Sequence, residues 1–380
     1  MIFICEISMD GNWFEFVAMQ GIQARNAFYI IMVPLKFVPK FFKFDDHSLP
    51  PSLRAQRTLN KSRIPQISRY ITENPEEYIL SSLCACVDGE VKFEPSEISN
   101  NMGKLKISMD ATVLINDGQH RRAAIEEAIK INPHLGEETI SIVLYADQGL
   151  KRSQQMFADL NMHAVKPAQS IKLLFNHRDE QTHITKSVIE SISLFSEFTD
   201  FEKSSISNRS TKMFTFSSIH QATKDLLAFN NNLSTEQSSH IASEFWQEVI
   251  QYIPGWLDLQ DGKTSSFHLR QNYIHAHGIA LQALARVGNI LLQEYPDNWQ
   301  NYLSKLIHVE WSRSNLAIWD GRALVAGKIN KSRNNLILVT NYIQRVLGIP
   351  LSDESQRVED QFINTQQVKH QTFSNIEEMV

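Results

Sequence analysis

The residue types with the clearest chemistry in this chain form one hexapeptide, residues 117–122, which reads Asp-Gly-Gln-His-Arg-Arg. A β-branched run at 111–116 precedes it, and apolar residues at helical spacing follow it over 121–130. The start of a helix presents unpaired backbone N–H groups and a partial positive charge, and both attract anions. Gly118 lets the backbone approach a phosphate closely, and the two arginines suit two-point contact with phosphate oxygens. The hexapeptide therefore predicts a phosphate-binding turn between a strand and a helix.

Two members of the hexapeptide leave their roles open. Asp117 would either cap the following helix or hold a magnesium ion that accompanies the phosphates, and His120 would add a side-chain donor. The simpler alternative is an ordinary helix start with a capping Asp117 and solvated arginines, and the spacing alone does not separate the two. The phosphate-loop pattern Gly-x4-Gly-Lys-Ser/Thr is absent, and a single glycine excludes a dinucleotide fingerprint.

Strand and helix patterns alternate in the first half of the chain and give way to helices in the second. Strands are predicted at 29–39, 78–87, 91–93, 111–116 and 140–146, and helices at 53–72, 121–130, 151–161 and 166–176. Helical patterns then continue at 183–197, 217–229, 235–252, 268–294, 296–307 and 333–347. The sequence therefore predicts an α+β protein with a mixed α/β N-terminal domain and a mostly α-helical C-terminal domain.

The same patterns divide the chain into four segments. Residues 1–27 form a weakly patterned leader, 28–182 carry the hexapeptide, and 183–350 are helical. Residues 351–380 hold six acids against two bases and predict a mobile acidic tail. The apolar helix at 333–347 suits a homo-oligomer interface or the core equally well.

The amino-acid composition limits the classes of protein to which this chain can belong. The chain has 380 residues, of which 42% are hydrophobic and 21% charged, and such a chain can bury a large core without disulfides or structural metals. Its net charge of -5 means that nucleic acid must be bound by local basic patches. Three cysteines suit a reducing cytoplasm, and Cys84 and Cys86 are expected to be core residues. No signal peptide or run of about 18 apolar residues occurs, so no membrane contact is expected.

Three regions, 34–70, 203–224 and 313–345, concentrate lysine and arginine. Such patches attract DNA phosphates to a protein whose net charge is negative. A solvated helix face would explain any single run, but three runs in one chain favour at least one DNA-facing surface. The candidate DNA-contacting residues are Arg54, Arg57, Lys61, Arg63, Arg313, Arg322, Lys328, Lys331 and Arg333.

The string Asp-Gly-Gln-His-Arg at 117–121 is the namesake of the DGQHR-domain proteins, which this chain resembles. The box is also similar to the Gly-Glu-Arg-Arg box of ParB-type partition proteins and the Gly-Cys-His-Arg box of sulfiredoxins. Within the DGQHR group, the chain resembles the DndB family of bacterial DNA sulfur modification (phosphorothioation) over about residues 30–350. The matching strings include Met32-Val-Pro-Leu-Lys, Arg63-Ile-Pro-Gln-Ile-Ser-Arg-Tyr-Ile, Phe157-Ala-Asp-Leu-Asn and Trp311-Ser-Arg-Ser-Asn.

The resemblance implies a ParB/sulfiredoxin-like fold for the N-terminal domain, with a pocket for ATP or CTP and magnesium at the box. Gly118, His120 and Arg121 match the pattern that these families share, which implies that they contact phosphate. Arg122 matches it only loosely. Asn161 matches a second ParB-like motif, although the Glu-Asn that should precede it is missing. The sulfiredoxin cysteine falls at Gln119, so sulfinic acid reduction is not expected. The nucleotide-binding set is Asp117, Gly118, Gln119, His120, Arg121, Arg122 and Asn161.

The resemblance also implies a function. DndB-like proteins are DNA-binding repressors of the sulfur-modification operon, so the expected partners are double-stranded promoter DNA and other DNA sulfur modification proteins. One alternative is a ParB-like nucleotide hydrolase (an ATPase or CTPase) or a nuclease acting in DNA modification. Another is a scaffold that binds the other modification proteins through its helical half. Because the Glu-Asn is missing, hydrolysis is less expected than phosphate binding, and no catalytic residue is assigned.

Metal and hydrolase motifs give no further site. His275 and His277 are two residues apart in a run predicted to be helical, so they point apart and cannot bind one ion together. The motifs Gly-x-Ser-x-Gly and His-Glu-x-x-His are both absent. No metal site is therefore predicted.

Overall fold

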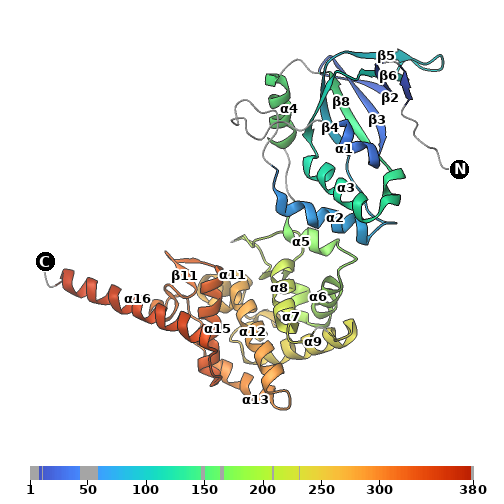
Figure 1. The fold of residues 1–380 in the computed structure, drawn as a ribbon. Coiled ribbons are helices and arrows are strands. Elements are labelled where there is room, and N and C mark those ends of the chain that lie inside the picture. Colours follow the sequence, from blue (N-terminus) through green and yellow to red (C-terminus); the bar gives the residue numbers. More distant parts are fainter. Residues whose placement is uncertain are drawn as a thin grey trace. The chain divides into compact units, whose positions relative to one another are not determined.

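The computed structural model of the protein describes residues 8–10, 12–42, 59–146, 150–162, 167–207, 209–230 and 232–377 (Figure 1). Within these ranges, the side chains of residues 8–10, 150–153, 161 and 368–377 are not described. The chain forms two units, Met1–Val165 and Lys166–Val380, and each is considered by itself. The predicted α+β class is confirmed, because the first unit is built on a sheet and the second is mostly helical.

The first unit is built on an eight-stranded sheet. The strands are β1 (Ser8–Asp10), β2 (Trp13–Gln23), β3 (Asn26–Pro34), β4 (Leu83–Asp88), β5 (Val91–Pro95), β6 (Met102–Ser108), β7 (Thr112–Asp117) and β8 (Thr139–Ala146). Seven strands follow the order β5-β6-β2-β3-β8-β4-β7, and β1 pairs with β2. Of the neighbouring pairs, only β4 and β8 are parallel.

Helices cover one face of this sheet. The elements are η1 (Leu35–Phe37), α1 (Val38–Phe41), η3 (Lys61–Arg63), α2 (Ile64–Glu73), α3 (Gln119–Ile131) and η4 (Pro133–Glu137), where η marks a 3-10 turn. Helix α4 (Leu150–Met162) lies on the opposite face, where its Met156 contacts Cys86 of β4. Ile71 of α2 and Ile125 of α3 are buried in one core with Phe16 and Ala18 of β2, whereas the intervening Val17 is exposed. Side chains alternate between the faces of a strand, so one face of β2 packs under the helices and the other faces outward.

The predicted boundaries of this half differ from the structure. The leader predicted for residues 1–27 contains β2, which pairs with β1, β3 and β6. Its outward-facing apolar residues weaken the alternation of polar and apolar residues by which a strand is recognised. The units divide after Val165 rather than at 182, and α5 (Gln169–Leu174) belongs to the second unit, where Ser170 Oγ donates to the carbonyl of Lys203 at 2.6 Å.

The second unit is built around two long helices that pack together, α8 (Phe216–Leu227) and α12 (Gly278–Glu294). The other helices are α6 (Glu180–Ser191), α7 (Ser193–Phe198), α9 (Thr235–Tyr252), α10 (Trp256–Gln260), α11 (Ser266–Asn272), α13 (Trp299–Leu303), α14 (Leu316–Trp319), α15 (Arg333–Leu347) and α16 (Asp353–Glu377). The short elements are β9 (Thr199–Asp200), β10 (Phe214–Thr215), η5 (Ile274–Ala276), η6 (Ser304–His308), β11 (Leu324–Val325) and β12 (Lys328–Ile329). Trp246, Trp256 and Trp319 are fully buried in the core of this unit.

The helix predicted over 268–294 is interrupted. Tyr273 is extended and forms a β-bridge with Ser312, so α11 ends at Asn272 and α12 begins only at Gly278. His275 therefore lies in η5, where it is fully buried and its Nδ1 accepts from Trp256 Nε1 at 3.0 Å. His277 is the residue before α12, and its side chain does not cap the helix. The two histidines have separate structural settings, and neither lies within a continuous helix.

The segment predicted to be an acidic tail contains α16, whose Glu359 is fully buried. The Glu359 carboxylate accepts from Arg322 Nη2 at 2.6 Å and Nη1 at 3.0 Å, and Arg345 Nη1 lies 3.3 Å away. Burial raises the pKa of Glu359, but the hydrogen bonds and charge of Arg322 outweigh it and lower the pKa below its ordinary value. Arg322 also lies over the ring of Phe362. The first half of α16 is thus packed against this unit through a buried ion pair.

We predict that Glu359→Ala lowers the free energy of unfolding by about 3–5 kcal/mol, because it leaves the Arg322 guanidinium buried without a counter-charge. Urea unfolding followed by tryptophan fluorescence reports on this unit, since five of the six tryptophans lie in it. The matched control is Glu354→Ala on the same helix. Glu354 forms an exposed pair with Arg333, so its loss should cost at most about 1 kcal/mol.

The same pair gives a pH dependence with a definite sign. The pKa of Glu359 is lower in the folded chain than in the unfolded chain, so its contribution to stability is complete above the ordinary value of 4.5. The contribution disappears as the pH falls through the folded pKa. The gap in unfolding free energy between wild type and Glu359→Ala should therefore narrow below about pH 4.5. Equal losses in both alanine variants at pH 7 would contradict the buried pair.

Candidate functional site

The hexapeptide occupies a sharp turn between β7 and α3, the placement that the sequence predicts. Gly118 has a φ of +107°, in the left-handed region that side chains rarely adopt. A Cβ at this position would lie 2.4 Å from Leu83 Cδ2 and 3.0 Å from Arg121 Nη2. Both the backbone angle and the close approach of β4 therefore require glycine, and α3 starts directly at the end of the strand.

The start of α3 presents unused hydrogen-bond donors. Gly118 is the residue before the helix, and it has no side chain with which to cap the first amides of α3. Asp117 does not cap the helix, which corrects one of its two predicted roles. Gln119 is buried, and its Nε2, like Arg121 Nε, has no hydrogen-bond partner within the described chain. Backbone and side-chain donors at this turn are thus available to an acceptor such as a phosphate.

His120 links the turn to a distant part of the chain. It is buried, and its Nε2 accepts from the backbone N–H of Asn60 at 3.0 Å. The Asn60 side chain accepts in turn from the backbone N–H of Ser62 at 3.1 Å and begins the 3-10 turn η3. Because this Nε2 acts as an acceptor, it cannot donate to a phosphate in this arrangement.

Arg121 connects the turn to the segment before β4. Its Nη1 donates to Ser81 Oγ at 2.6 Å, and its Nη2 donates to the Ser82 carbonyl at 3.2 Å and to Asp117 Oδ2 at 2.8 Å. The Asp117 carboxylate is about half exposed and the Arg121 side chain is partly exposed. This ion pair can open to a competing anion at little cost, because exposed pairs contribute little to stability. Ser81 and Ser82 carry no sequence signal that would have identified them.

Arg122 faces the interior of the unit. It is buried, donates to Glu126 Oε2 at 2.9 Å and donates to the Pro39 carbonyl at 2.7 Å. Burial lowers its pKa, and the neighbouring carboxylate of Glu126 partly offsets this. Arg122 therefore joins α3 to the first turn of α1, and phosphate contact is not supported for it.

Two other predicted features lie near this turn. Asn161 is in α4, which packs against β7, but its side chain is among those that are not described. Cys84 and Cys86 are buried in β4, and burial raises the pKa of Cys84 to about 12. Cys86 Sγ lies 3.5 Å from Met156 Sδ of α4. Both cysteines are core residues of the strand, as expected from the sequence.

The predicted DNA-contacting residues fall into four settings. Arg54 and Arg57 lie outside the described residues. Lys61, Arg63 and Lys328 are exposed, and Arg333 forms an exposed pair with Glu354. Arg313 and Lys331 line a cavity of the helical unit. Arg322 is buried against Glu359, and this corrects its assignment as a DNA contact, because a buried and paired guanidinium cannot reach a phosphate backbone.

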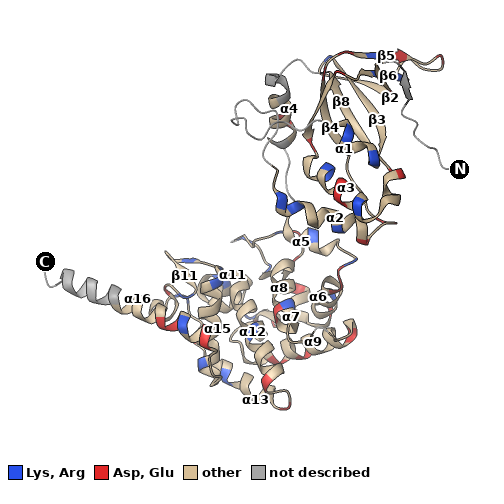
Figure 2. Cartoon of the chain, in the orientation of Figure 1, with Lys and Arg blue, Asp and Glu red and all other residues tan. Residues whose placement is uncertain are grey.

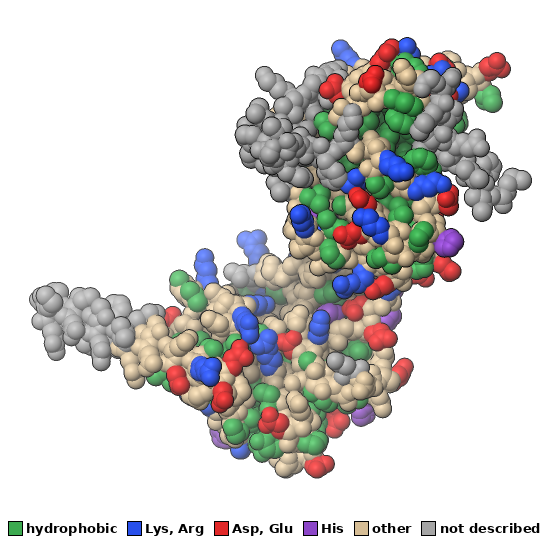
Figure 3. All heavy atoms as spheres, in the orientation of Figure 1, with side chains coloured by type: hydrophobic (Ala, Val, Ile, Leu, Met, Phe, Trp, Pro, Cys, Tyr) green, Lys and Arg blue, Asp and Glu red, His purple; other side chains and the backbone are tan. Residues whose placement is uncertain are grey.

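Basic and acidic side chains are mixed on the visible face of each unit. Lys and Arg lie among Asp and Glu there, as Figures 2 and 3 show. Within the described residues, no group of three or more His, Cys, Asp and Glu side chains could hold a metal ion. No helix in the described ranges is long and apolar enough to cross a bilayer.

Comparison with known proteins identifies one match. A family model described as DndB, DNA-sulfur modification-associated, matches residues 16–350, which is most of the chain. No curated protein and no solved structure matches. The likeness of the first unit to ParB proteins and sulfiredoxins therefore stays a prediction from the box.

We predict that Arg122→Met lowers the free energy of unfolding by about 2–3 kcal/mol, because it leaves the Pro39 carbonyl without its donor and removes the partner of Glu126. Urea unfolding followed by circular dichroism measures this. Lys130→Met is the matched control, since exposed Lys130 pairs with the same carboxylate at 3.5 Å and should contribute at most about 0.5 kcal/mol. A stable Arg122→Met variant that has lost nucleotide affinity would instead assign Arg122 to the ligand.

Proposed function

Because the chain belongs to the DndB family of DNA-sulfur modification-associated proteins, we propose that it is a DNA-binding regulator of DNA sulfur modification. The family match carries this proposal. In it, double-stranded promoter DNA contacts the exposed cations around η3, and a nucleotide, ATP or CTP, binds at the turn before α3. Asp117 would hold the accompanying magnesium ion once Arg121 has moved onto the phosphates.

The η3–α2 surface has the properties of a DNA contact. Lys61, Arg63 and Arg69 are exposed, and no carboxylate of the described chain forms an ion pair with any of them (Figure 2). The opposite face of α2 is anchored by buried Ile64 and Ile71, so Arg69 lies on a packed helix, and Lys61 and Arg63 lie in the turn that leads directly into it. Unpaired lysines and arginines on a rigid element are suited to neutralising DNA phosphates.

The phosphate-binding turn is supported by its donors. The first amides of α3 are uncapped, and Gln119 Nε2 and Arg121 Nε are buried without partners within the described residues. A phosphate at this position would draw Arg121 away from Asp117, since both compete for the same guanidinium.

Asn60 offers a physical connection between the two sites. Its backbone N–H donates to His120 next to the nucleotide turn, while its side chain begins the 3-10 turn that carries Lys61 and Arg63. A nucleotide that shifts His120 would therefore shift the cations that face DNA. This arrangement gives the regulator a route by which nucleotide binding changes DNA affinity.

The alternative of a nucleotide hydrolase has less support. The carboxylates nearest the turn are bound to arginines, Asp117 to Arg121 and Glu126 to Arg122, so neither is a ready base for activating water. Nucleotide turnover by the wild type that is lost in Arg121→Ala would favour the hydrolase.

We expect the full chain to bind its own upstream DNA, and the double variant Lys61→Ala/Arg63→Ala to bind it more weakly. Each lost phosphate contact should reduce the magnitude of the slope of log affinity against log salt concentration by about 0.9. The slope of the double variant should therefore be smaller in magnitude by about 2 than that of the wild type. Gel shifts over a salt series measure this. Lys130→Ala, which removes an exposed lysine paired with Glu126, is the control and should leave the slope unchanged. An affinity for DNA that does not change with salt concentration would contradict binding through phosphates. Retention of a partner protein without any DNA binding would contradict the proposal and favour a scaffold.

We expect Arg121→Ala to weaken ATP or CTP affinity by about tenfold or more through loss of a phosphate contact, and His120→Ala to weaken it by releasing the turn from Asn60, as measured by calorimetry. His120→Ala should also weaken DNA binding, since it releases Asn60, whereas Lys61→Ala should leave nucleotide affinity unchanged. Unfolding curves serve as the control. Collapse of the fold in Arg121→Ala would show that the turn is a structural helix start only, and silence of the wild type with both nucleotides would remove the nucleotide from the proposal.

A further inference from the structure

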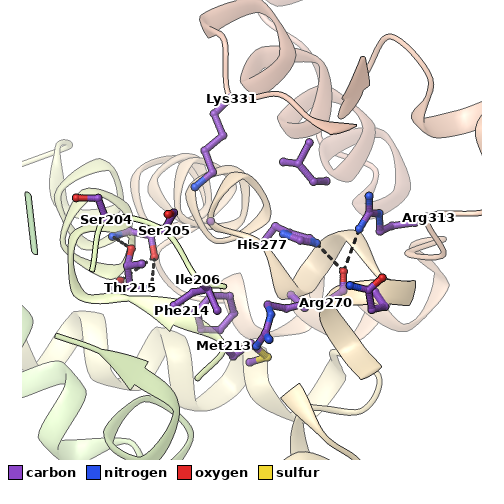
Figure 4. A pocket seen from close by; sticks show the side chains of 15 residues that line it. Ser204, Ser205, Ile206, Met213, Phe214, Thr215, Arg270, His277, Arg313 and Lys331 are labelled. Carbon is purple, nitrogen blue, oxygen red and sulfur yellow. Dashed lines mark hydrogen bonds between the residues drawn. The ribbon is translucent and has the colours of Figure 1, made fainter. Parts of the chain in front are cut away.

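A cavity of about 430 Å³ lies in the helical unit, at the place where α8 and α12 both begin. Figure 4 shows Ser204, Ser205 and Thr215 at one end of it, Arg313 beside His277 at the other, and Lys331 reaching in between. Its residues come from the loop before β10, from the starts of the two helices and from the segments that flank the β11–β12 hairpin. None of them belongs to the turn before α3, so this is a second candidate site.

Two cations of this cavity can act on a ligand. Lys331 forms no hydrogen bond or ion pair in the described chain, and desolvation lowers the pKa of its ammonium. Arg313 donates from Nη1 to the Arg270 carbonyl at 3.1 Å and from Nη2 to the Gly327 carbonyl at 3.2 Å, which leaves three of its five N–H donors. Among the described residues, no aspartate or glutamate lines the cavity.

Arg270 and His277 form a fixed wall beneath these cations. Arg270 is buried and donates to the carbonyls of Lys212, Ser207 and Ser210, so it holds the loop before β10. His277 Nε2 donates to the Arg270 carbonyl at 2.9 Å. Burial, together with the nearby charges of Arg313, Lys331 and Arg270, lowers the pKa of His277 to about 4, so the ring is neutral at pH 7. The Arg270 carbonyl therefore positions both His277 and Arg313.

The start of α12 adds to the positive potential. Helix α8 has its own cap, because Thr215 Oγ1 accepts from the Ser218 amide, but no side chain caps α12. A Cβ on Gly278, the first residue of α12, would lie 2.6 Å from Lys331 Nζ. A lysine ammonium therefore lies against the positive end of a 17-residue helix. Such an arrangement is unfavourable without an anion and becomes favourable when an anion lies between the two.

The size and the remaining walls indicate more than an inorganic ion. The volume falls within the range of about 300–1,000 Å³ that is typical of small-molecule sites. Partly exposed Ile206 and Ile329 supply an apolar surface, with buried Phe214 behind it, and the serine and threonine hydroxyls supply hydrogen bonds.

We propose that this cavity binds a phosphorylated small molecule of the mononucleotide class. Its phosphate lies between Lys331, Arg313 and the first amides of α12, and its ring lies on the apolar wall. Arg313 and Lys331, predicted from the sequence to contact DNA, thus line this cavity. Lys331 and neighbouring Lys328 are both exposed to solvent, but Lys328 does not line the cavity.

The test is calorimetry on the full chain with ADP and, separately, inorganic pyrophosphate. An Arg121→Ala background removes the contribution of the turn before α3, so that failure of that site and of this one can be distinguished. Lys331→Met should weaken both probes by about tenfold or more. Lys328→Met, which removes an exposed lysine three residues earlier, should change either affinity by less than about twofold. ADP should bind more tightly than pyrophosphate, because only ADP can use the apolar wall.

The opposing results are equally clear. Equal losses in Lys331→Met and Lys328→Met would show diffuse attraction and no site. If Lys331→Met loses DNA binding while its ADP affinity is unchanged, Lys331 contacts DNA and the proposal is wrong. The proposal is also overturned if neither ADP nor pyrophosphate binds at millimolar concentration. Should Lys331→Met fail to fold, as judged by its unfolding curve, Arg313→Lys serves instead. It keeps the charge but loses the second phosphate contact, and must still weaken ADP binding.

Discussion

The left-handed backbone of Gly118 is the constraint on which the arrangement of the first unit depends. It turns the chain from β7 into α3 within one residue, with β4 so close that a methyl group would collide with Leu83. Because the helix starts there, its first-turn side chains reach three separate segments: the start of α1, the residue before η3 and the residues before β4. One turn thus determines how these segments are joined, and it still leaves the amides of α3 uncapped.

Local features of the fold could be predicted from the sequence, and long-range partners could not. The strand at 140–146 and the helix from 121 correspond closely to β8 and α3, because regular spacing of apolar residues depends only on neighbours along the chain. The partners of His120 and Arg122, at Asn60 and Pro39, depend on how distant segments pack. The same limit explains why the prediction that Arg322 contacts DNA is wrong. The local charge of the sequence suggests a surface position, but the carboxylate that pairs with Arg322 lies 37 residues further along the chain.

The basic side chains at the two candidate sites differ in whether carboxylates neutralise them. At the turn before α3, Asp117 and Glu126 neutralise the arginines, so a ligand must compete with the protein for them. In the helical unit, Lys331 and Arg313 have no acidic neighbour in their cavity, and carbonyl groups hold Arg313. The first arrangement suits reversible exchange of partners, whereas the second stores positive potential that an anion relieves. Charge patterns in the sequence do not distinguish them, because the neutralising groups are brought close only by folding.

The burial of Glu359 has a consequence for how the chain can be shortened. The family match ends at residue 350, which would be a natural place to truncate the protein for biochemical work. Such a cut would remove α16 and leave the Arg322 guanidinium facing an apolar interior beside Tyr342 with no anion to balance it. The useful end point of a recombinant fragment therefore lies beyond Phe362, whose ring covers that guanidinium, and not at the limit of the recognised family.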